Sequence, residues 1–198
     1  VSQSPKQSKL IALARDINDS KPAWVTENVK EFISAEFQNI QNEDSVLEVG
    51  TGSGYVASKI KEKCFKIIGS DINPQACIRA KKDNIDVVRS NLMDAFRKNS
   101  FDMVLFNPPY LPEDGHKFEE WFEIATVGGE TGREVIESFL DDLKRILTHK
   151  GCALLLASTE SGISEIEAYA NEKGFNINVV AEDTYHAEKL VVFQITHY

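Results

Sequence analysis

Leu47-Glu-Val-Gly-Thr-Gly-Ser-Gly54 is the stretch of sequence that decides the fold of this chain. It begins inside a short apolar run at residues 45–49 and leads into a stretch with helical periodicity that starts at about Tyr55. Closely spaced glycines between a strand and a helix allow the tight turn that opens an α/β sheet. The sequence therefore predicts a strand at 45–49, a glycine turn, and a helix over about 55–62.

The alternation of short apolar runs with helical stretches continues to the end of the chain. Strands are predicted at 65–70, 85–88, 102–106 and 153–157, helices at about 74–82, 132–147 and 161–173, and a final antiparallel pair at 175–181 and 189–196. Strand–helix alternation implies a parallel sheet with helices on both faces. We therefore expect a Rossmann-like α/β fold with a seven-stranded sheet that is mostly parallel and has an antiparallel C-terminal strand.

The length of 198 residues fits a single domain, expected over residues 1–198. Its N-terminal part carries apolar residues at helical spacing, and Pro22 is suited to the first turn of a helix. We expect N-terminal helices at about 7–37, packed on the rest of the domain.

Composition and charge restrict the class of protein. The chain is 42% hydrophobic and 27% charged, has no apolar run of membrane-spanning length, and carries a formal net charge of -9. That charge works against binding a long phosphate backbone. The three cysteines form no CxxC pair and the histidines show no metal-ligand spacing, so we expect a cytoplasmic protein without a metal.

The glycine turn and the residue that ends the second strand predict a cofactor site. Gly50, Gly52 and Gly54 let the backbone approach a ligand, and the helix behind them offers free N–H groups to a carboxylate such as that of S-adenosylmethionine. Asp71, 21 residues after Gly50, is placed to accept hydrogen bonds from two ribose hydroxyls. The spacing is GxGxG, with Tyr55 where dinucleotide-binding enzymes carry a third glycine, which disfavours a nicotinamide cofactor.

A second motif follows the fourth predicted strand as Asn107-Pro108-Pro109-Tyr110. A rigid turn that ends the strand explains the prolines, but not the amide before them or the aromatic ring after them. The Asn107 side-chain oxygen and the Pro108 carbonyl can accept both N–H groups of a planar –NH2, and Tyr110 can form a flat wall beside it. This arrangement favours methyl transfer to an amide or amino nitrogen, with no metal and no covalent enzyme intermediate.

The glycine loop, Asp71 and NPPY in this order resemble class I S-adenosylmethionine-dependent methyltransferases that act on amino nitrogens. Val127-Gly-Gly-Glu-Thr-Gly-Arg-Glu-Val-Ile-Glu-Ser-Phe-Leu140 also resembles the GGxxGREVIxxFL stretch of HemK-like release-factor glutamine methyltransferases, and most closely that of their short eukaryotic and archaeal branch. The resemblance implies methylation of the glutamine in the GGQ motif of a peptide chain release factor, with S-adenosylhomocysteine as the product. On this reading Gly128, Gly129 and Gly132 shape a substrate channel beside NPPY.

The resemblance also assigns roles residue by residue. It implies cofactor contacts at Glu48, Gly50, Thr51, Gly52, Gly54, Asp71, Ile72, Asn91, Leu92 and Asn107. It implies catalytic roles for Asn107, Pro108 and Tyr110, and substrate contacts at these three, Pro109 and Gly129.

The sequence departs from the family pattern at two places. Asn91 stands where the family usually has an aspartate that contacts the adenine amino group, although an amide oxygen can accept the same hydrogen bond. The Tyr-Pro-x-x-Asp-[Ser/Thr] motif of the short branch is missing, and Lys21-Pro-Ala-Trp-Val-Thr-Glu27 only loosely matches the corresponding bacterial segment. Thr26 is the residue of that segment expected to reach the cofactor, with a core or helix-cap role as the alternative.

The short branch works with a small zinc-binding activator subunit that covers an apolar sheet edge. Ile85, Val87 and Val88 on the third predicted strand are candidates for that surface, and ordinary sheet core is the other interpretation.

Two other functions compete with glutamine methylation. NPPY alone also fits a nucleic-acid methyltransferase acting on adenine N6 or guanine N2, because a flipped base presents a similar –NH2. Asn91 and the missing N-terminal motif also allow a non-catalytic, cofactor-binding scaffold.

Overall fold

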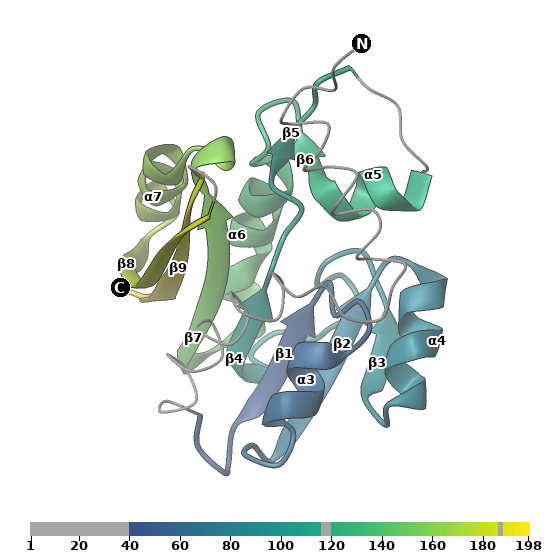
Figure 1. Cartoon of the computed structure of the whole chain (residues 1–198). Helices are drawn as coiled ribbons and strands as arrows, with labels where there is room; N and C mark the ends of the chain where they lie inside the picture. The colour runs from purple at the N-terminus through teal and green to yellow at the C-terminus, as the bar shows by residue number, and fades with distance from the viewer. Residues whose placement is uncertain (1–39, 116–119, 186–187) are drawn as a thin grey trace.

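Seven strands form one sheet in the computed structural model, which describes residues 40–115, 120–185 and 188–198. The strand order is β3-β2-β1-β4-β7-β9-β8, and all neighbours pair in parallel except β9, which runs antiparallel to both β7 and β8 (Figure 1). This confirms the predicted sheet. The strands are β1 Ser45–Val49, β2 Lys66–Asp71, β3 Asp86–Arg89, β4 Phe101–Phe106, β7 Leu147–Ser158, β8 Phe175–Tyr185 and β9 Glu188–His197. The expected N-terminal helices and Thr26 lie outside the described residues.

Helices cover both faces of the sheet, so successive strand residues are buried in two separate cores. One face packs against α3 (Tyr55–Ile60) and α4 (Pro74–Lys82), which contribute Ala57, Ile60 and Ala80. The other face packs against α6 (Glu134–Ile146) and α7 (Ile163–Glu172), whose buried residues include Phe139 and Ile166. Val46 and Leu47 of β1 are fully buried in opposite cores, which explains why this strand reads as a continuous apolar run.

Several predicted boundaries differ from the structure by one or two residues, and larger differences occur at the start of β7 and at the end of β8, which extends to Tyr185 rather than to 181. The helix α3 ends at Ile60 rather than at about 62, and β7 begins at Leu147 rather than at 153. Phe101 of β4 pairs with Leu147, and after a register shift Met103 pairs with Cys152. The bulge adds half-exposed and exposed residues to the start of β7, so the apolar pattern marks only its second half.

Four short elements were not predicted: β5 Leu111–Pro112, α5 Glu120–Thr126, β6 Val127–Gly129 and the 3-10 helix η1 Thr159–Ser161. β5 and β6 form a separate two-stranded parallel sheet, which lies with α5 above the main sheet in Figure 1. A two-residue strand is too short to show a periodicity that sequence analysis can detect.

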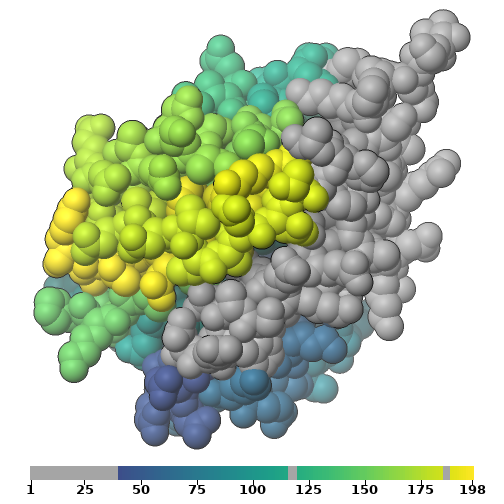
Figure 2. Space-filling view, turned by 60° about the vertical axis from the view of Figure 1, so that its left-hand side comes forward, coloured from purple at the N-terminus to yellow at the C-terminus, as the bar shows by residue number. Residues whose placement is uncertain are grey.

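The two edges of the main sheet differ. β8 and β9 lie together on the face seen in Figure 2, and β8 contains a register shift between Val179 and Ala181 that disrupts its edge. β3 forms the opposite edge and is only four residues long. Within the described ranges, no helix is both long and apolar enough to cross a bilayer.

Candidate active site

The carboxyl ends of β1, β2 and β4 meet where the strand order reverses, which is where ligands bind in sheets of this kind. Val49 is level with Ser70 on one side and with Phe106 on the other. The residues that follow these three are Gly50, Asp71 and Asn107, so the sheet register brings the predicted cofactor loop and the predicted catalytic turn together.

The Asp71 carboxylate holds the glycine loop against β2. Its Oδ2 accepts a hydrogen bond from the Gly52 N–H at 2.8 Å, and its Oδ1 accepts one from the Asn73 N–H at 2.8 Å. Each oxygen retains acceptor capacity for another donor. Burial raises the pKa of Asp71 above its ordinary value, against the effect of these backbone hydrogen bonds. The carboxylate is half-buried, so it can both support the loop and face a ligand.

Gly52 is the part of the loop that leaves open space. Its φ is +56°, and a Cβ placed there would meet no atom of the described residues within 4 Å. A Cβ on Gly50, in contrast, would lie 3.5 Å from the Phe106 ring and 3.9 Å from the Asn107 carbonyl oxygen. The glycine loop therefore contacts the NPPY turn at Gly50 and is open at Gly52.

Glu48 and Thr51 point into the protein rather than along the open loop. The Thr51 hydroxyl donates to Glu48 Oε2 at 2.6 Å, and the Ala57 N–H of α3 donates to the same oxygen at 3.1 Å. Both residues are buried. Burial raises the pKa of Glu48 from 4.5 to about 7, although the two hydrogen bonds lower it. These contacts support the loop from behind.

Gly54 begins α3 with a φ of +77° and lies close to α4. A Cβ there would be 3.1 Å from both Ala80 Cβ and Ile85 Cγ1. Gly54 thus allows close packing beneath the loop. The third glycine of dinucleotide-binding enzymes has the same role, although it stands at a different spacing. Ile85 is buried in this contact, so it belongs to the core and not to a partner surface.

Ile72 and Asn91 extend the site beyond Asp71. Ile72 is 40% exposed and presents an apolar surface at the end of β2. Asn91 is exposed and Leu92 is half-buried, with a φ of +43° at Leu92. Both line a cavity of about 660 Å³ that also borders the glycine segment after α5.

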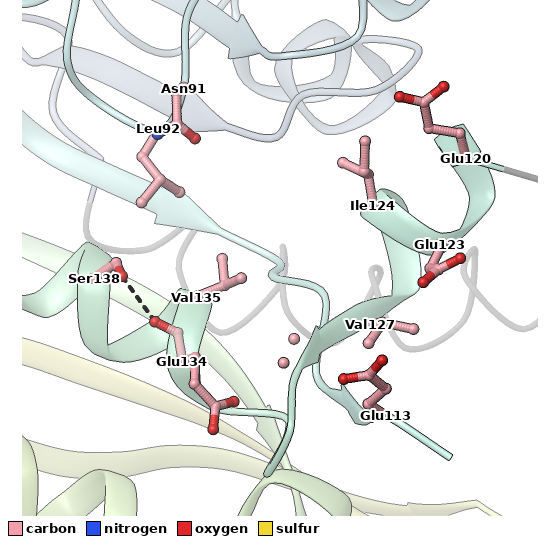
Figure 3. Close-up of a pocket in the computed structure, with 12 residues that line it drawn as sticks. Asn91, Leu92, Glu113, Glu120, Glu123, Ile124, Val127, Glu134, Val135 and Ser138 are labelled. Atoms are coloured by element: carbon pink, nitrogen blue, oxygen red, sulfur yellow. Dashed lines mark hydrogen bonds between the residues drawn. The ribbon is translucent and has the colours of Figure 1, made fainter. Parts of the chain in front are cut away.

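Figure 3 shows the walls of this cavity. Asn91 and Leu92 lie on one side, α5 faces them across it, and Val135 and Ser138 of α6 lie on another side. Four glutamates line the cavity together with apolar side chains: Glu113, Glu120, Glu123 and Glu134. The contribution of α5 is not predictable from the sequence, because a seven-residue helix of mixed composition gives little periodic signal.

The first residue of the NPPY turn, Asn107, carries the side-chain amide of this motif. Asn107 is exposed, and among the described residues no group hydrogen-bonds its side chain. Pro108 is buried, and Tyr110 packs against the cores on both faces of the sheet. Burial, with a smaller effect of Glu160, raises the pKa of Tyr110 to about 12, so its phenol stays neutral and is no general base at neutral pH.

The residues at this site fit S-adenosylmethionine. Gly52 leaves room for close approach, Asp71 offers carboxylate oxygens to ribose hydroxyls, and Ile72 offers an apolar surface to a base. Asn107 follows β4, the strand that pairs with β1 on the side opposite to β2. In the ranges that the structure describes, no three His, Cys, Asp or Glu side chains gather as a metal site.

Comparison with known proteins gives consistent matches. The methyltransferase domain family matches residues 47–129. A chain of Methanocaldococcus jannaschii named as a protein N5-glutamine methyltransferase is 33% identical over 162 residues, covering 78% of this chain and 81% of that relative. The eRF1 methyltransferase catalytic subunit of Schizosaccharomyces pombe is 30% identical over 173 residues, covering 75% of this chain and 74% of the relative.

A solved structure shows the same fold. The E. cuniculi Mtq2–Trm112 complex, described as methylating the eRF1 translation termination factor, aligns with a TM-score of 0.73 and 23% identity. The alignment covers 90% of this chain and 98% of that chain.

Proposed function

Since this chain belongs to the HemK-like family of protein N5-glutamine methyltransferases, we propose that it methylates the GGQ glutamine of a peptide chain release factor. It is an S-adenosylmethionine-dependent methyltransferase. The observation that carries the substrate proposal is the exposed Asn107 amide, which follows β4 directly beside the glycine loop. An amide that no described residue hydrogen-bonds suits a planar –NH2 group at this place.

The proposed mechanism rests on two acceptors. The nitrogen of a glutamine amide is a poor nucleophile, because its lone pair is delocalised into the carbonyl. The Asn107 side-chain oxygen accepts one N–H group and the Pro108 carbonyl accepts the other, which orients the nitrogen and stabilises the positive charge that develops on it. Tyr110 packs beside the planar group as a neutral ring.

In this proposal the cofactor lies along the ends of β1 and β2. Gly50 and Gly52 provide close backbone approach, Asp71 accepts from the ribose hydroxyls, and Ile72 and Asn91 contact the adenine. S-adenosylmethionine, when bound, supplies a methyl group on a positively charged sulfur. Glu48 and Thr51 hold the loop in place through their mutual hydrogen bond.

The cavity beside the turn favours a protein substrate over a nucleic acid. Its four glutamates oppose the approach of phosphates, and its apolar residues, such as Ile124 and Val127, can contact side chains. The net charge of -9 works in the same direction.

We further propose that a small zinc-binding activator subunit covers the β3 edge. Val88 of β3 is 36% exposed and Ile78 of α4 is 51% exposed, and α4 packs next to β3. Capture of these apolar side chains and of the unpaired strand edge would protect both from solvent.

Labelled S-adenosylmethionine tests the substrate proposal. The protein, alone and with the activator subunit, is incubated with a release factor, with the same factor whose GGQ glutamine is replaced by alanine, and with RNA and DNA. Label is expected only in the unmodified factor. Equal labelling of the two factors, or labelling of nucleic acid alone, would refute glutamine methylation. Asn107→Ala is expected to abolish the transfer, and unchanged transfer would refute the proposed catalytic role.

A further inference from the structure

The side chain of Glu134, the first residue of α6, turns back onto the glycine segment before it. Its Oε1 accepts hydrogen bonds from the Thr131 N–H at 3.0 Å and the Thr131 hydroxyl at 2.8 Å. Its Oε2 accepts one from the Arg133 N–H at 3.2 Å. Burial raises the pKa of Glu134, but these hydrogen bonds outweigh it and hold the pKa below its usual value. The carboxylate is therefore ionised and bound to the segment 128–132, which we call the glycine clasp.

The glycine clasp is folded too tightly to accept side chains. A Cβ on Gly129, which has a φ of +112°, would collide with the Glu134 carboxylate. A Cβ on Gly128 would collide with the Gly132 carbonyl. The Gly132 N–H also donates to the Gly129 carbonyl at 3.2 Å, which closes the turn. The hydrogen bonds of Glu134 thus hold a loop whose backbone is already closely packed.

The outer surface of the glycine clasp lies against the backbone of the NPPY turn. A Cβ on Gly128 would be 2.6 Å from the Pro109 carbonyl oxygen, and one on Gly132 would be 2.5 Å from the Tyr110 carbonyl oxygen. The Glu113 N–H donates to the Gly129 carbonyl at 2.9 Å, next to the β5–β6 pairing. These contacts reach the two carbonyls that directly follow Pro108.

We propose that Glu134 is a positioning residue for methyl transfer, which fixes the glycine clasp and through it the direction of the Asn107 amide and the Pro108 carbonyl. This inference rests on the proposed function of the NPPY turn. Glu134 touches no reacting atom in this account. Loss of its carboxylate therefore reduces the rate of the methyl-transfer step, because the two acceptors lose their alignment, and leaves cofactor affinity unchanged.

Glu137 supplies a matched control. It lies in the same first turn of α6, so its negative charge also faces the positive end of the helix dipole. Its carboxylate pairs with Arg133 Nε at 3.3 Å. A general effect of acidic residues at this helix end would appear in both variants, whereas of the two carboxylates only that of Glu134 hydrogen-bonds the glycine clasp.

The experiment compares Glu134→Ala, Glu134→Gln and Glu137→Ala. Glu134→Ala is expected to lower kcat about 100-fold while KM for the cofactor changes less than about twofold. Glu134→Gln keeps one acceptor oxygen, so it is expected to lose about tenfold in kcat, and Glu137→Ala less than about twofold. Amide hydrogen exchange gives a second readout that needs no substrate. Exchange at Glu113 should accelerate at least about tenfold in Glu134→Ala, while exchange at Thr51, whose N–H donates to the Ser70 carbonyl, should not change.

Two results would overturn the inference. One is an equal kcat for Glu134→Ala and Glu137→Ala. The other is a loss of activity in Glu134→Ala that is fully explained by a smaller fraction of folded protein, together with equal acceleration of amide exchange at Thr51 and Glu113. If the wild-type protein labelled no release factor, the proposed function would be refuted instead. The difference in amide exchange between Glu113 and Thr51 would still test whether Glu134 holds the glycine clasp.

Discussion

Gly132→Ala directly tests whether the backbone after the NPPY turn must keep its position. Gly132 has a φ of +81°, and its added Cβ would lie 2.5 Å from the Tyr110 carbonyl oxygen. Ordinary contact begins at 3.4 Å, so the two backbones must separate by about 0.9 Å. A displacement of about 1 Å near reacting groups costs about 100-fold in rate. We expect kcat/KM for release-factor methylation to fall by about that factor.

Gly115→Ala is the matched control for this variant. Gly115 has a φ of +78°, so alanine meets nearly the same backbone strain there, but its Cβ would meet no atom within 4 Å in the part of the chain that the structure describes. The strain costs about 1 kcal/mol of unfolding free energy in both variants, and the collision at Gly132 adds about 1–3 kcal/mol. Gly115→Ala is therefore expected to keep kcat/KM within about twofold of wild type.

The assay measures labelled methyl transfer at a temperature where thermal unfolding shows all three proteins folded. Calorimetric titration with S-adenosylhomocysteine follows the cofactor site, which is expected to stay intact in both variants. If Gly132→Ala and Gly115→Ala had the same kcat/KM, the contact with Tyr110 would have no role in catalysis and the reasoning would fail.

Three further predictions concern the cofactor loop and the β3 edge. The pKa of Glu48 is raised to about 7 in the folded protein, so the folded state binds this proton more tightly than the unfolded state does. The resulting contribution to the free energy of unfolding is full below pH 4.5 and is lost as the pH rises through 7. Between pH 4.5 and 8, the free energy of unfolding of Glu48→Gln, measured with urea, should therefore increase by about 3 kcal/mol relative to that of wild type. Plots of this free energy against pH that run parallel for the two proteins would contradict the prediction. Gly54→Ala should lower the melting temperature more than Gly52→Ala does, whereas Gly52→Ala should weaken S-adenosylhomocysteine binding more than Gly54→Ala does. The reverse order in calorimetry would refute a packing role for Gly54 and a ligand-facing role for Gly52. Val88→Lys should weaken binding of the activator subunit at least about tenfold without changing the melting temperature of the catalytic chain, and an unchanged Kd would remove the β3 edge from the interface.

The parallel part of the fold follows from sequence because its central strands, β1 and β4, are buried on both faces and form continuous apolar runs. β1 was predicted with its observed bounds, and β3 at the sheet edge was displaced by one residue. The bulged start of β7 and the β5–β6 sheet were not predicted, since they depend on backbone contacts between segments that are distant in the chain. Local periodicity carries no information about such contacts.

For the candidate site, the residue pattern predicts where polar residues lie along the chain but not the directions of their side chains. Asp71 and Asn107 are both predicted at strand ends, and the structure puts them at the same end of the sheet, on the two strands that flank β1. Glu48 and Thr51 were expected at the cofactor, yet their side chains bond to each other beneath the loop. Which side of a tight turn a side chain faces depends on the φ and ψ of its glycines, and these do not appear in the residue pattern.

The two glycine-rich segments look alike in sequence but differ in what their glycines allow. In the first, Gly52 faces open space, so the absence of a side chain gives room to a ligand. In the second, Gly128 and Gly132 face backbone carbonyls, so the absence of side chains lets one segment press against another. Glycine is needed for close approach in both cases, but the approaching partner is a ligand in one and the NPPY turn in the other. The second segment therefore borders the expected substrate channel, while its outer surface, which carries Gly128 and Gly132, packs against the NPPY turn.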